Sequence, residues 1–328
     1  MDGMTASPSR FDVAIAGEIN LDLVLDGIKE PMPVERELLA SAFRITLGSS
    51  AAILAHNLAA LGTRVGFATL AGRDDFAAMA LSYLAERKVD LSGVRQSDGP
   101  AGSGVTVVVN HGATRHILSY PGTAHEMTLA HLDLDHLCAA RHFHLSSLYL
   151  LKGLHEGLPD LFRKIRQRGL TISLDTNDDP DDRWRGVLDE LLPLVDVLLP
   201  NERELLRIAG ESDIDAALAV LSRTVPLIVV KRGARGAIVQ KGGSRLDIPP
   251  VAVTPSDQIG AGDSFNAGFL ACHVRGLPPE ECARAGNITG AVSTLKPGGI
   301  EAFRDDAFLR KSIRDLAPGL SALNLPLQ

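Results

Sequence analysis

The stretch Asp257-Gln258-Ile259-Gly260-Ala261-Gly262-Asp263-Ser264-Phe265 carries the strongest structural signal in this 328-residue sequence. Residues 250–253 before it look like an extended run, and a helical pattern follows from Phe265 to Val274. The first N–H groups of a helix lack intrahelical partners, so the small residues here would let an anion reach them. Asp263 would then lie beside that anion, where a base for an attacking hydroxyl has to be. A Gly-Ala-Gly turn followed by an acidic residue also occurs as ordinary helix-start chemistry, so these four residues alone leave both interpretations open.

Composition narrows the class of protein. Hydrophobic residues make up 45% and charged residues 22%, which predicts a large core rather than disorder. A net charge of −7 is unfavourable for non-specific nucleic-acid binding, because that needs a basic surface. No apolar run approaches the roughly 18 residues of a membrane span. Residues 1–10 lack the apolar core of a signal peptide, and we interpret them as a flexible tail of a cytoplasmic protein.

The cysteine count agrees with a reducing compartment. The chain has three cysteines, Cys138, Cys272 and Cys282, and their spacing matches no metal motif. Cys272 falls inside an apolar helical run, so we expect it to fill space in the core.

Short apolar runs alternate with longer amphipathic stretches along most of the chain. This order predicts an α/β protein whose mostly parallel sheet is covered by helices on both faces. Strands are expected at 11–16, 65–70, 142–145, 170–174, 196–199, 227–231 and 236–240, and helices at 49–61, 75–87, 157–168, 184–191, 202–208 and 214–223.

Two segments interrupt this alternation. Residues 18–47 contain a strand-like run at 21–25 and a proline-containing stretch. Residues 104–120 have the pattern of a hairpin with its turn at Asn110-His111-Gly112. Because neither segment has a helix to pair with, we expect strands from about 18–47 and 100–123 to form a small sheet able to cover a site. Residues 11–328 would then form one domain that includes this sheet.

The nonamer at 257–265 resembles the C-terminal signature of the ribokinase-like (PfkB) carbohydrate kinases, Asp-Thr-x-Gly-Ala-Gly-Asp-x-Phe. The resemblance extends from about Phe11 to Ala302. It implies a three-layer α/β/α ribokinase-like fold with a β-sheet lid, and transfer of the γ-phosphate of ATP to a sugar hydroxyl with Mg²⁺. It also implies Asp263 as the catalytic base and, in many members, a homodimer formed through the lid. The anion hole would be formed by the N–H groups of Gly260, Ala261 and Gly262.

The same resemblance implies a sugar site near the first strand. The family holds sugar hydroxyls with a Gly-x-x-Asn-x-Asp stretch, which matches Gly17-Glu18-Ile19-Asn20-Leu21-Asp22 here. Asn20 and Asp22 would bind the substrate, since a carboxylate can accept two hydroxyl donors. Alternatively, Asp22 is only a polar residue on the wet face of a strand.

The family's N-terminal signature, roughly Gly-Gly-x-x-Ala-Asn, matches less well. Gly48 and Ser49 begin the matching segment and would contact the substrate, with Ser49 in place of the second glycine. Ile53 stands where the family's sugar-binding asparagine usually lies, and Asn57 follows one helical turn later. Ser146 aligns with a carboxylate that contacts the sugar in some ribokinases. These departures leave the identity of the sugar open.

The resemblance also implies nucleotide and metal sites. Asn201-Glu202-Arg203-Glu204 matches an Asn-x-x-Glu motif linked to Mg²⁺, with Glu204 acting through water, although the same pattern is a helix capping box. Residues 229–237 match the strand–turn–strand under the nucleotide. The nucleotide-binding residues would be Asn201, Lys231, Gly233, Gly236 and Asn287. A monovalent cation, with K⁺ as the candidate, would lie near Asp257, Ile259, Ser293, Lys296 and Gly298.

Other functions were weighed against this one. The sequence has no Gly-x-x-x-x-Gly-Lys-[Ser/Thr] motif, which excludes a Walker-type kinase, and no Gly-x-Gly-x-x-Gly after the first strand. His142 and His144 are neighbours on one strand face, and we interpret them as structural rather than as zinc ligands. Within the family, the hairpin at 104–120 argues against vitamin kinases, whereas a nucleoside kinase stays open. A non-catalytic sugar- or nucleotide-sensing module is the alternative from another class.

Overall fold

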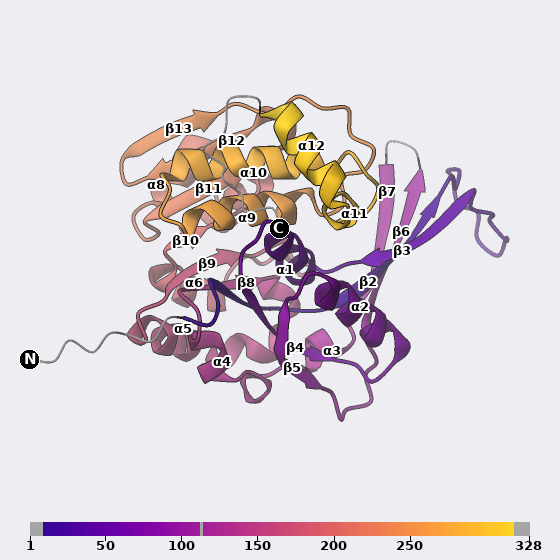
Figure 1. The fold of residues 1–328 in the computed structure, drawn as a ribbon, viewed down its shortest axis with the longest axis horizontal. Helices are drawn as coiled ribbons and strands as arrows, with labels where there is room; N and C mark the ends of the chain where they lie inside the picture. Colours follow the sequence, from indigo (N-terminus) through magenta and orange to yellow (C-terminus); the bar gives the residue numbers. More distant parts are fainter. Residues whose placement is uncertain (1–8, 112–113, 318–328) are drawn as a thin grey trace, which may run out of the picture.

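The computed structural model of the protein describes residues 9–111 and 114–317 (Figure 1). Residues 1–8 of the predicted tail and Gly112 of the predicted turn lie outside the described residues. Across the described ranges, no helix combines the length and the hydropathy that a membrane crossing requires.

Within these residues the main sheet has nine strands in the order β13-β12-β11-β10-β9-β8-β1-β4-β5. The strands from β5 to β11 in this order run parallel to their neighbours, and the two at the other end are antiparallel. The mostly parallel sheet expected from the sequence is therefore confirmed. The strands are β1 (Val13–Ala16), β4 (Val65–Ala71), β5 (Asp90–Gln96), β8 (His142–Ser146), β9 (Thr171–Asp175), β10 (Val197–Leu198), β11 (Leu227–Lys231), β12 (Ala237–Lys241) and β13 (Ser244–Ile248).

Two edge strands were not predicted from the sequence. Strands β5 and β13 carry mostly exposed or partly exposed side chains, because an edge strand has a solvated side and forms no continuous apolar run. The run at 250–253 is not a strand of either sheet: those residues form the connection after β13.

Two hydrophobic cores lie on opposite faces of the main sheet. Side chains of one strand alternate between them, with Val13 and Ile15 in one core and Ala14 and Ala16 in the other. This arrangement confirms the predicted three layers, and Cys272 is buried in the first core as expected. Helices α1 (Ser50–Ala60), α2 (Asp75–Glu86), α9 (Ala261–His273), α10 (Pro279–Ser293), α11 (Glu301–Arg304) and α12 (Asp306–Leu316) contribute to the first core. Helices α3 (Thr123–Glu126), α4 (Leu134–Cys138), α5 (Leu158–Gln167), α6 (Val187–Leu191), α7 (Glu202–Ala209) and α8 (Ile214–Leu221) contribute to the second.

A second, four-stranded sheet extends from the main body, as the sequence predicts (Figure 1). Its order is β3-β2-β6-β7, with an antiparallel pair on each side of the parallel pair β2 and β6. We call it the small sheet. Its strands are β2 (Asn20–Asp26), β3 (Ala42–Leu47), β6 (Gly104–His111) and β7 (Thr114–Tyr120). The sequence did not single out β3 as a strand.

The topology fixes where a ligand can bind. Strand β1 lies between β8 and β4, and the chain builds the sheet outward in one direction through β4 and β5 and in the other through β8 to β11. A crevice forms at the carboxyl ends of the strands where the direction of building changes. The loops after β1, β8, β9, β10 and β11 all leave the sheet at this edge.

Candidate active site

The predicted anion-binding loop is the first turn of α9. Gly260 caps this helix with φ 70°, in the left-handed region that glycine adopts readily. A Cβ at position 260 would also lie 2.7 Å from the Cα of Gly299, so only glycine fits there. Ala261, Gly262 and Asp263 follow in the first helical turn and are partly exposed. The Ala261 N–H donates to the carbonyl of Gln258 at 3.3 Å, which leaves Gly262 and Asp263 with the free N–H groups of a helix start.

Asp263 lies in a setting that suits a base. Burial raises the pKa of its carboxyl to about 7, and the negative charge of Asp175 adds to this effect. The charge of Lys231 and a hydrogen bond from Ser50 act in the opposite direction. A general base works best when its pKa lies near the operating pH.

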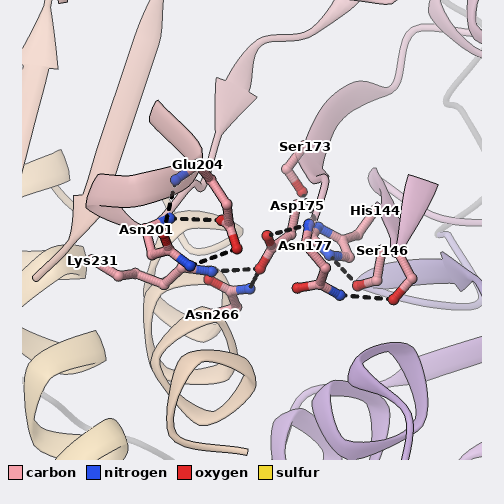
Figure 2. A network of polar contacts seen from close by, with 10 residues as sticks. His144, Ser146, Ser173, Asp175, Asn177, Asn201, Glu204, Lys231 and Asn266 are labelled. Carbon is pink, nitrogen blue, oxygen red and sulfur yellow. Dashed lines mark hydrogen bonds and ion pairs between the residues drawn. The ribbon is translucent and has the colours of Figure 1, made fainter. Parts of the chain in front are cut away.

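Lys231 supplies a positive charge to the network of polar contacts drawn in Figure 2. Its ammonium group forms an ion pair with Asp175, whose side chain is 0% exposed. Asn266 donates to the same carboxyl oxygen at 2.5 Å, and the N–H of Asn177 donates to the other oxygen at 3.3 Å. A Cβ at Gly262 would lie 3.8 Å from Lys231 Nζ, so the ammonium group borders the start of α9.

Asp175 and Asn266 were missed by the sequence analysis. Asp175 is the last residue of β9, at the edge of the sheet where the other candidate residues gather. That position is the signal that could have revealed it. Asn266 lies about one helical turn beyond Asp263 on α9, directly after the matched nonamer 257–265.

Asn201 and Glu204 form the capping box that starts α7. The N–H and the side-chain amide of Asn201 donate to the two Glu204 oxygens at 2.8 and 2.5 Å, and the Glu204 N–H donates back at 2.9 Å. Burial raises the pKa of Glu204 to about 7, and the charge of Asp175 adds to this. Each carboxylate oxygen keeps a second lone pair, so Glu204 can still accept a hydrogen bond from a Mg²⁺-bound water.

The other predicted nucleotide residues have different surroundings. Gly236 has φ 81°, and a Cβ there would lie 2.1 Å from the carbonyl oxygen of Ile248, so packing alone requires this glycine. Gly233 has φ 55° and faces open space. The Asn287 amide donates to the Pro249 carbonyl at 2.8 Å, which ties α10 to the end of β13.

Three predicted acceptor-site residues meet at the base of the small sheet. A Cβ at Gly48 would lie 2.1 Å from Asp22 Oδ1 and 2.3 Å from Asn20 Oδ1, so both side chains lie directly over this glycine. Asn20 donates to Thr106 Oγ1 at 3.1 Å, while its own Oδ1 is buried without a partner among the described residues. Burial raises the pKa of Asp22 to about 7, and the charge of Asp263 is the next contribution. The acceptor side and the start of α9 therefore share one electrostatic environment.

Glu18 is a further acidic group, at a variable position of the Gly-x-x-Asn-x-Asp stretch. Its Oε1 accepts from the Ser147 hydroxyl at 2.7 Å and from the Ser50 N–H at 3.2 Å. Its Oε2 is buried and has no partner within the described part of the chain. Ser49, predicted to contact substrate, donates to the Glu18 carbonyl at 2.6 Å and caps α1 by accepting from the Ala52 N–H.

The other residues at which the sequence departs from the family pattern have buried side chains that contact other parts of the protein. Ile53 is 3% exposed and packs under the loop, with its Cδ1 2.6 Å from where a Cβ of Gly299 would be. Asn57 is buried and donates to Ser264 Oγ and to the Gly299 carbonyl, both at 2.9 Å. Ser146 bonds to His144 at 2.9 Å. Ile53 and Asn57 thus hold the segment around Gly299 and the first turns of α9 in place.

His144 belongs to a buried polar chain along β8 and β9. It bonds to Ser173 Oγ at 2.6 Å, and His142 bonds to the same oxygen at 2.7 Å. Burial lowers the pKa of His144 to about 4 and that of His142 well below its usual value. Both imidazoles are therefore neutral and hydrogen-bonded to hydroxyl groups, in agreement with the structural interpretation.

The residues predicted to surround a monovalent cation only partly converge. Asp257 accepts from the N–H groups of Ile259 and Gly298, each at 3.0 Å. Ser293 donates to a carbonyl of its own helix at 2.9 Å. The ammonium group of Lys296 pairs with Asp305 at 3.0 Å rather than with Asp257.

Comparison with known proteins agrees with this geometry. Residues 10–306 match the pfkB family of carbohydrate kinases. A protein from Archaeoglobus fulgidus named as an uncharacterized sugar kinase is 27% identical, over 74% of this chain and 96% of the relative. A cytidine kinase from Thermococcus kodakarensis is 29% identical, over 88% and 98% of the two chains.

The fold has close counterparts among solved structures. One of them, an E. coli protein designated Ribokinase II and solved in complex with ATP and Mg²⁺, superimposes with a TM-score of 0.80 at 22% identity. The alignment covers 92% of this chain and 99% of that protein. Since the family match spans residues 10–306, nearly the whole chain, the protein belongs to the pfkB family of carbohydrate kinases, enzymes that transfer phosphate to sugar hydroxyls.

Proposed function

We propose that the protein transfers the γ-phosphate of ATP to a hydroxyl of a small sugar, as ribokinases, fructokinases and ketodeoxygluconate kinases do. The observation that carries this proposal is the position of Asp263. It lies at the start of α9 beside Lys231, and its charge reaches Asp22 on the acceptor side. A base between an anion site and a group of hydroxyl acceptors is what phosphoryl transfer to an alcohol requires.

In the proposed reaction, Asp263 takes the proton of the acceptor hydroxyl. The acceptor oxygen then bonds to the γ-phosphorus, the bond from that phosphorus to the bridging oxygen breaks, and ADP leaves with the electron pair. The N–H groups of Gly262 and Asp263 and the Lys231 ammonium group stabilise the charge that develops on the phosphoryl oxygens. Asn20 and Asp22 orient the sugar. Bound Mg²⁺, held through water near Glu204, would neutralise the phosphates.

A nucleoside kinase is the second candidate. The observation that favours it is the cytidine kinase among the relatives, since a nucleoside presents the same kind of ribose hydroxyl. Against it stands the polar character of the acceptor side, where Glu18 Oε2 and Asn20 Oδ1 are buried without partners in the described residues. These oxygens suit a ligand with many hydroxyl groups.

A coupled assay of ADP release tests the assignment. The acceptors are ribose, fructose, 2-keto-3-deoxygluconate, adenosine and cytidine, with ATP and Mg²⁺ present, and a reaction without acceptor gives the background. We expect turnover with at least one sugar. Turnover with nucleosides alone would select the second candidate. Binding of ATP and a sugar without any ADP release would instead favour the sensing module.

We also propose that the small sheet acts as a lid and that a second copy of the chain docks on its apolar face. Ile45, Leu23, Val107 and Leu118 lie in one register row across all four strands, and Leu118 is 59% exposed. Alternation along a strand puts this row on the face opposite Asp22. Light scattering should give the mass of a dimer for the wild type and of a monomer for Leu118→Asp. A monomeric wild type would refute this proposal.

We also propose a cytoplasmic location, because the proposed activity needs ATP. All three cysteines are free thiols, in agreement with a reducing compartment.

A further inference from the structure

Strand β3 brings a guanidinium group to the turn that precedes the anion loop. Arg44 lies on β3 opposite Val24 of β2, and one end of its guanidinium forms an ion pair with Asp26. The other end, Nη2, donates to Asp257 Oδ2 at 3.2 Å. The Asp257 side chain is 8% exposed and that of Arg44 is 27% exposed, so this contact is partly shielded from water.

The same strand touches the neighbouring loop at a second point. Thr46 follows Arg44 by two residues and therefore lies on the same face of the sheet. A Cβ at Gly298 would lie 3.1 Å from Thr46 Oγ1, and the Gly298 N–H donates to Asp257. Strand β3 thus contacts the loop at both Asp257 and Gly298.

Asp257 shapes the entry to α9. Its Oδ1 accepts from the Ile259 N–H, one residue before the Gly260 cap, and its Oδ2 accepts from Gly298 and Arg44. These bonds hold the backbone of the turn that leads into the anion loop. A charged carboxylate this deeply buried needs a nearby cation.

The donor set does not fit an additional monovalent cation. Both Asp257 oxygens already accept hydrogen bonds, and the Arg44 guanidinium provides the positive charge. A K⁺ ion bound to this carboxylate would lie beside that guanidinium, and like charges at such a distance repel. The Ser293 hydroxyl and the Lys296 ammonium group have other partners, so these two side chains add no ligand beyond the backbone carbonyls.

We propose that Arg44 is the resident cation of the Asp257 turn, so that the enzyme works without a monovalent cation. Arg44 is a positioning residue: through Asp257 it keeps the turn in the shape that Gly260 and the start of α9 require. It also joins the small sheet to the anion loop, so the position of that sheet and the geometry of the anion loop are coupled. This inference rests on the proposed kinase function only for its activity readout.

The first experiment compares rates in KCl and in tetramethylammonium chloride at equal ionic strength, with the best acceptor from the screen. The wild type should give the same kcat in both salts. Arg44→Met should lose about tenfold in kcat in tetramethylammonium, equivalent to about 1.4 kcal/mol. K⁺ or added guanidinium should restore part of that loss. Arg64→Met is the matched control, because Arg64 bonds Asp12 just before β1, at the opposite edge of the sheet, and it should behave as the wild type.

A second readout does not need activity. The thermal unfolding midpoint of the wild type should be the same in the two salts, whereas that of Arg44→Met should rise when K⁺ replaces tetramethylammonium. If no acceptor is found, this measurement still tests the inference, and the failure then belongs to the proposed function alone. Activation of the wild type by K⁺ would overturn the proposal, as would an Arg44→Met variant that is fully active and insensitive to K⁺. Should Arg44→Met fail to fold, the wild-type comparison and Arg44→Lys, which keeps a cation and should need no K⁺, decide the question.

Discussion

The two sides of the proposed active site are built in different ways. The phosphate side is one continuous turn, Gly260–Asp263, whose main donors are backbone groups, with one cation from Lys231. The acceptor side is assembled from a loop after β1, the paired strands of the small sheet and the start of α1. Backbone N–H groups bind phosphate whatever the side chains are. The contacts that side chains on paired strands make, in contrast, change when those residues are substituted. Under the proposed function, the acceptor side is therefore the side that selects the substrate.

Asp263, where the two sides meet, offers the most direct test of this difference. Asp263→Asn removes the base but keeps the shape and the N–H groups of the turn. We expect kcat to fall at least about a hundredfold, because a positioned base contributes roughly 10²–10⁴-fold. ATP binding, measured by calorimetry, should change little. Near-normal turnover would exclude Asp263 as the base.

Lys231→Met tests the cation on the phosphate side. It removes the charge next to Gly262 and leaves the Asp175 carboxylate buried without its ion-pair partner. Loss of one charge-stabilising donor lowers kcat by roughly 10²-fold, and breaking a buried pair costs about 3–5 kcal/mol of unfolding free energy. Steady-state kinetics and urea unfolding measure the two effects separately. In the double variant Lys231→Met/Asp175→Asn, stability should recover while kcat stays low; recovery of both would reduce Lys231 to a structural role.

Gly48→Ala tests the acceptor side alone. The added Cβ would collide with Asn20 and Asp22, so the acceptor KM should rise about tenfold, or about 1.4 kcal/mol. The KM for ATP should stay the same, because Gly48 is not part of the phosphate turn. Gly243→Ala is the control, since a Cβ there meets no atom within 4 Å. An equal change in both KM values would contradict the division into two sides.

The smallest expected effect is a shift in the pH profile. Because the pKa of Asp263 is raised to about 7, the base is protonated and inactive below that pH, so kcat/KM should fall as the pH drops through about 7. The charge of Asp263 raises the pKa of Asp22. Because repulsion between two charges is mutual, Asp22→Asn should move this limb to lower pH. Measurement of kcat/KM from about pH 5 to about pH 9, a range that brackets this titration, gives the shift. A wild-type limb near the ordinary pKa of aspartate would contradict the raised value.

Much of the fold could be predicted because its signals are local. Buried parallel strands such as β1 and β11 are mostly continuous apolar runs, and the alternation of strands with helices fixes the layers. The edge strands β5 and β13 have mostly exposed or partly exposed side chains and form no such run, so the pattern of apolar residues did not predict them. The roles carried over from the family for the predicted site residues stay predictions until the variants are made.

The sequence by itself determined the phosphate turn, since Gly260, Ala261, Gly262 and Asp263 are adjacent and a helix start supplies its own donors. Only the tertiary structure decided what surrounds that turn. Arg44 reaches Asp257 across 213 residues of chain, and Lys231 reaches Asp175 across 56. Such pairs depend on strand register and on the meeting of two sheets, which no local pattern encodes. Charges far apart in the chain become partners because burial makes an unpaired charge costly, and that condition exists only after the chain has folded.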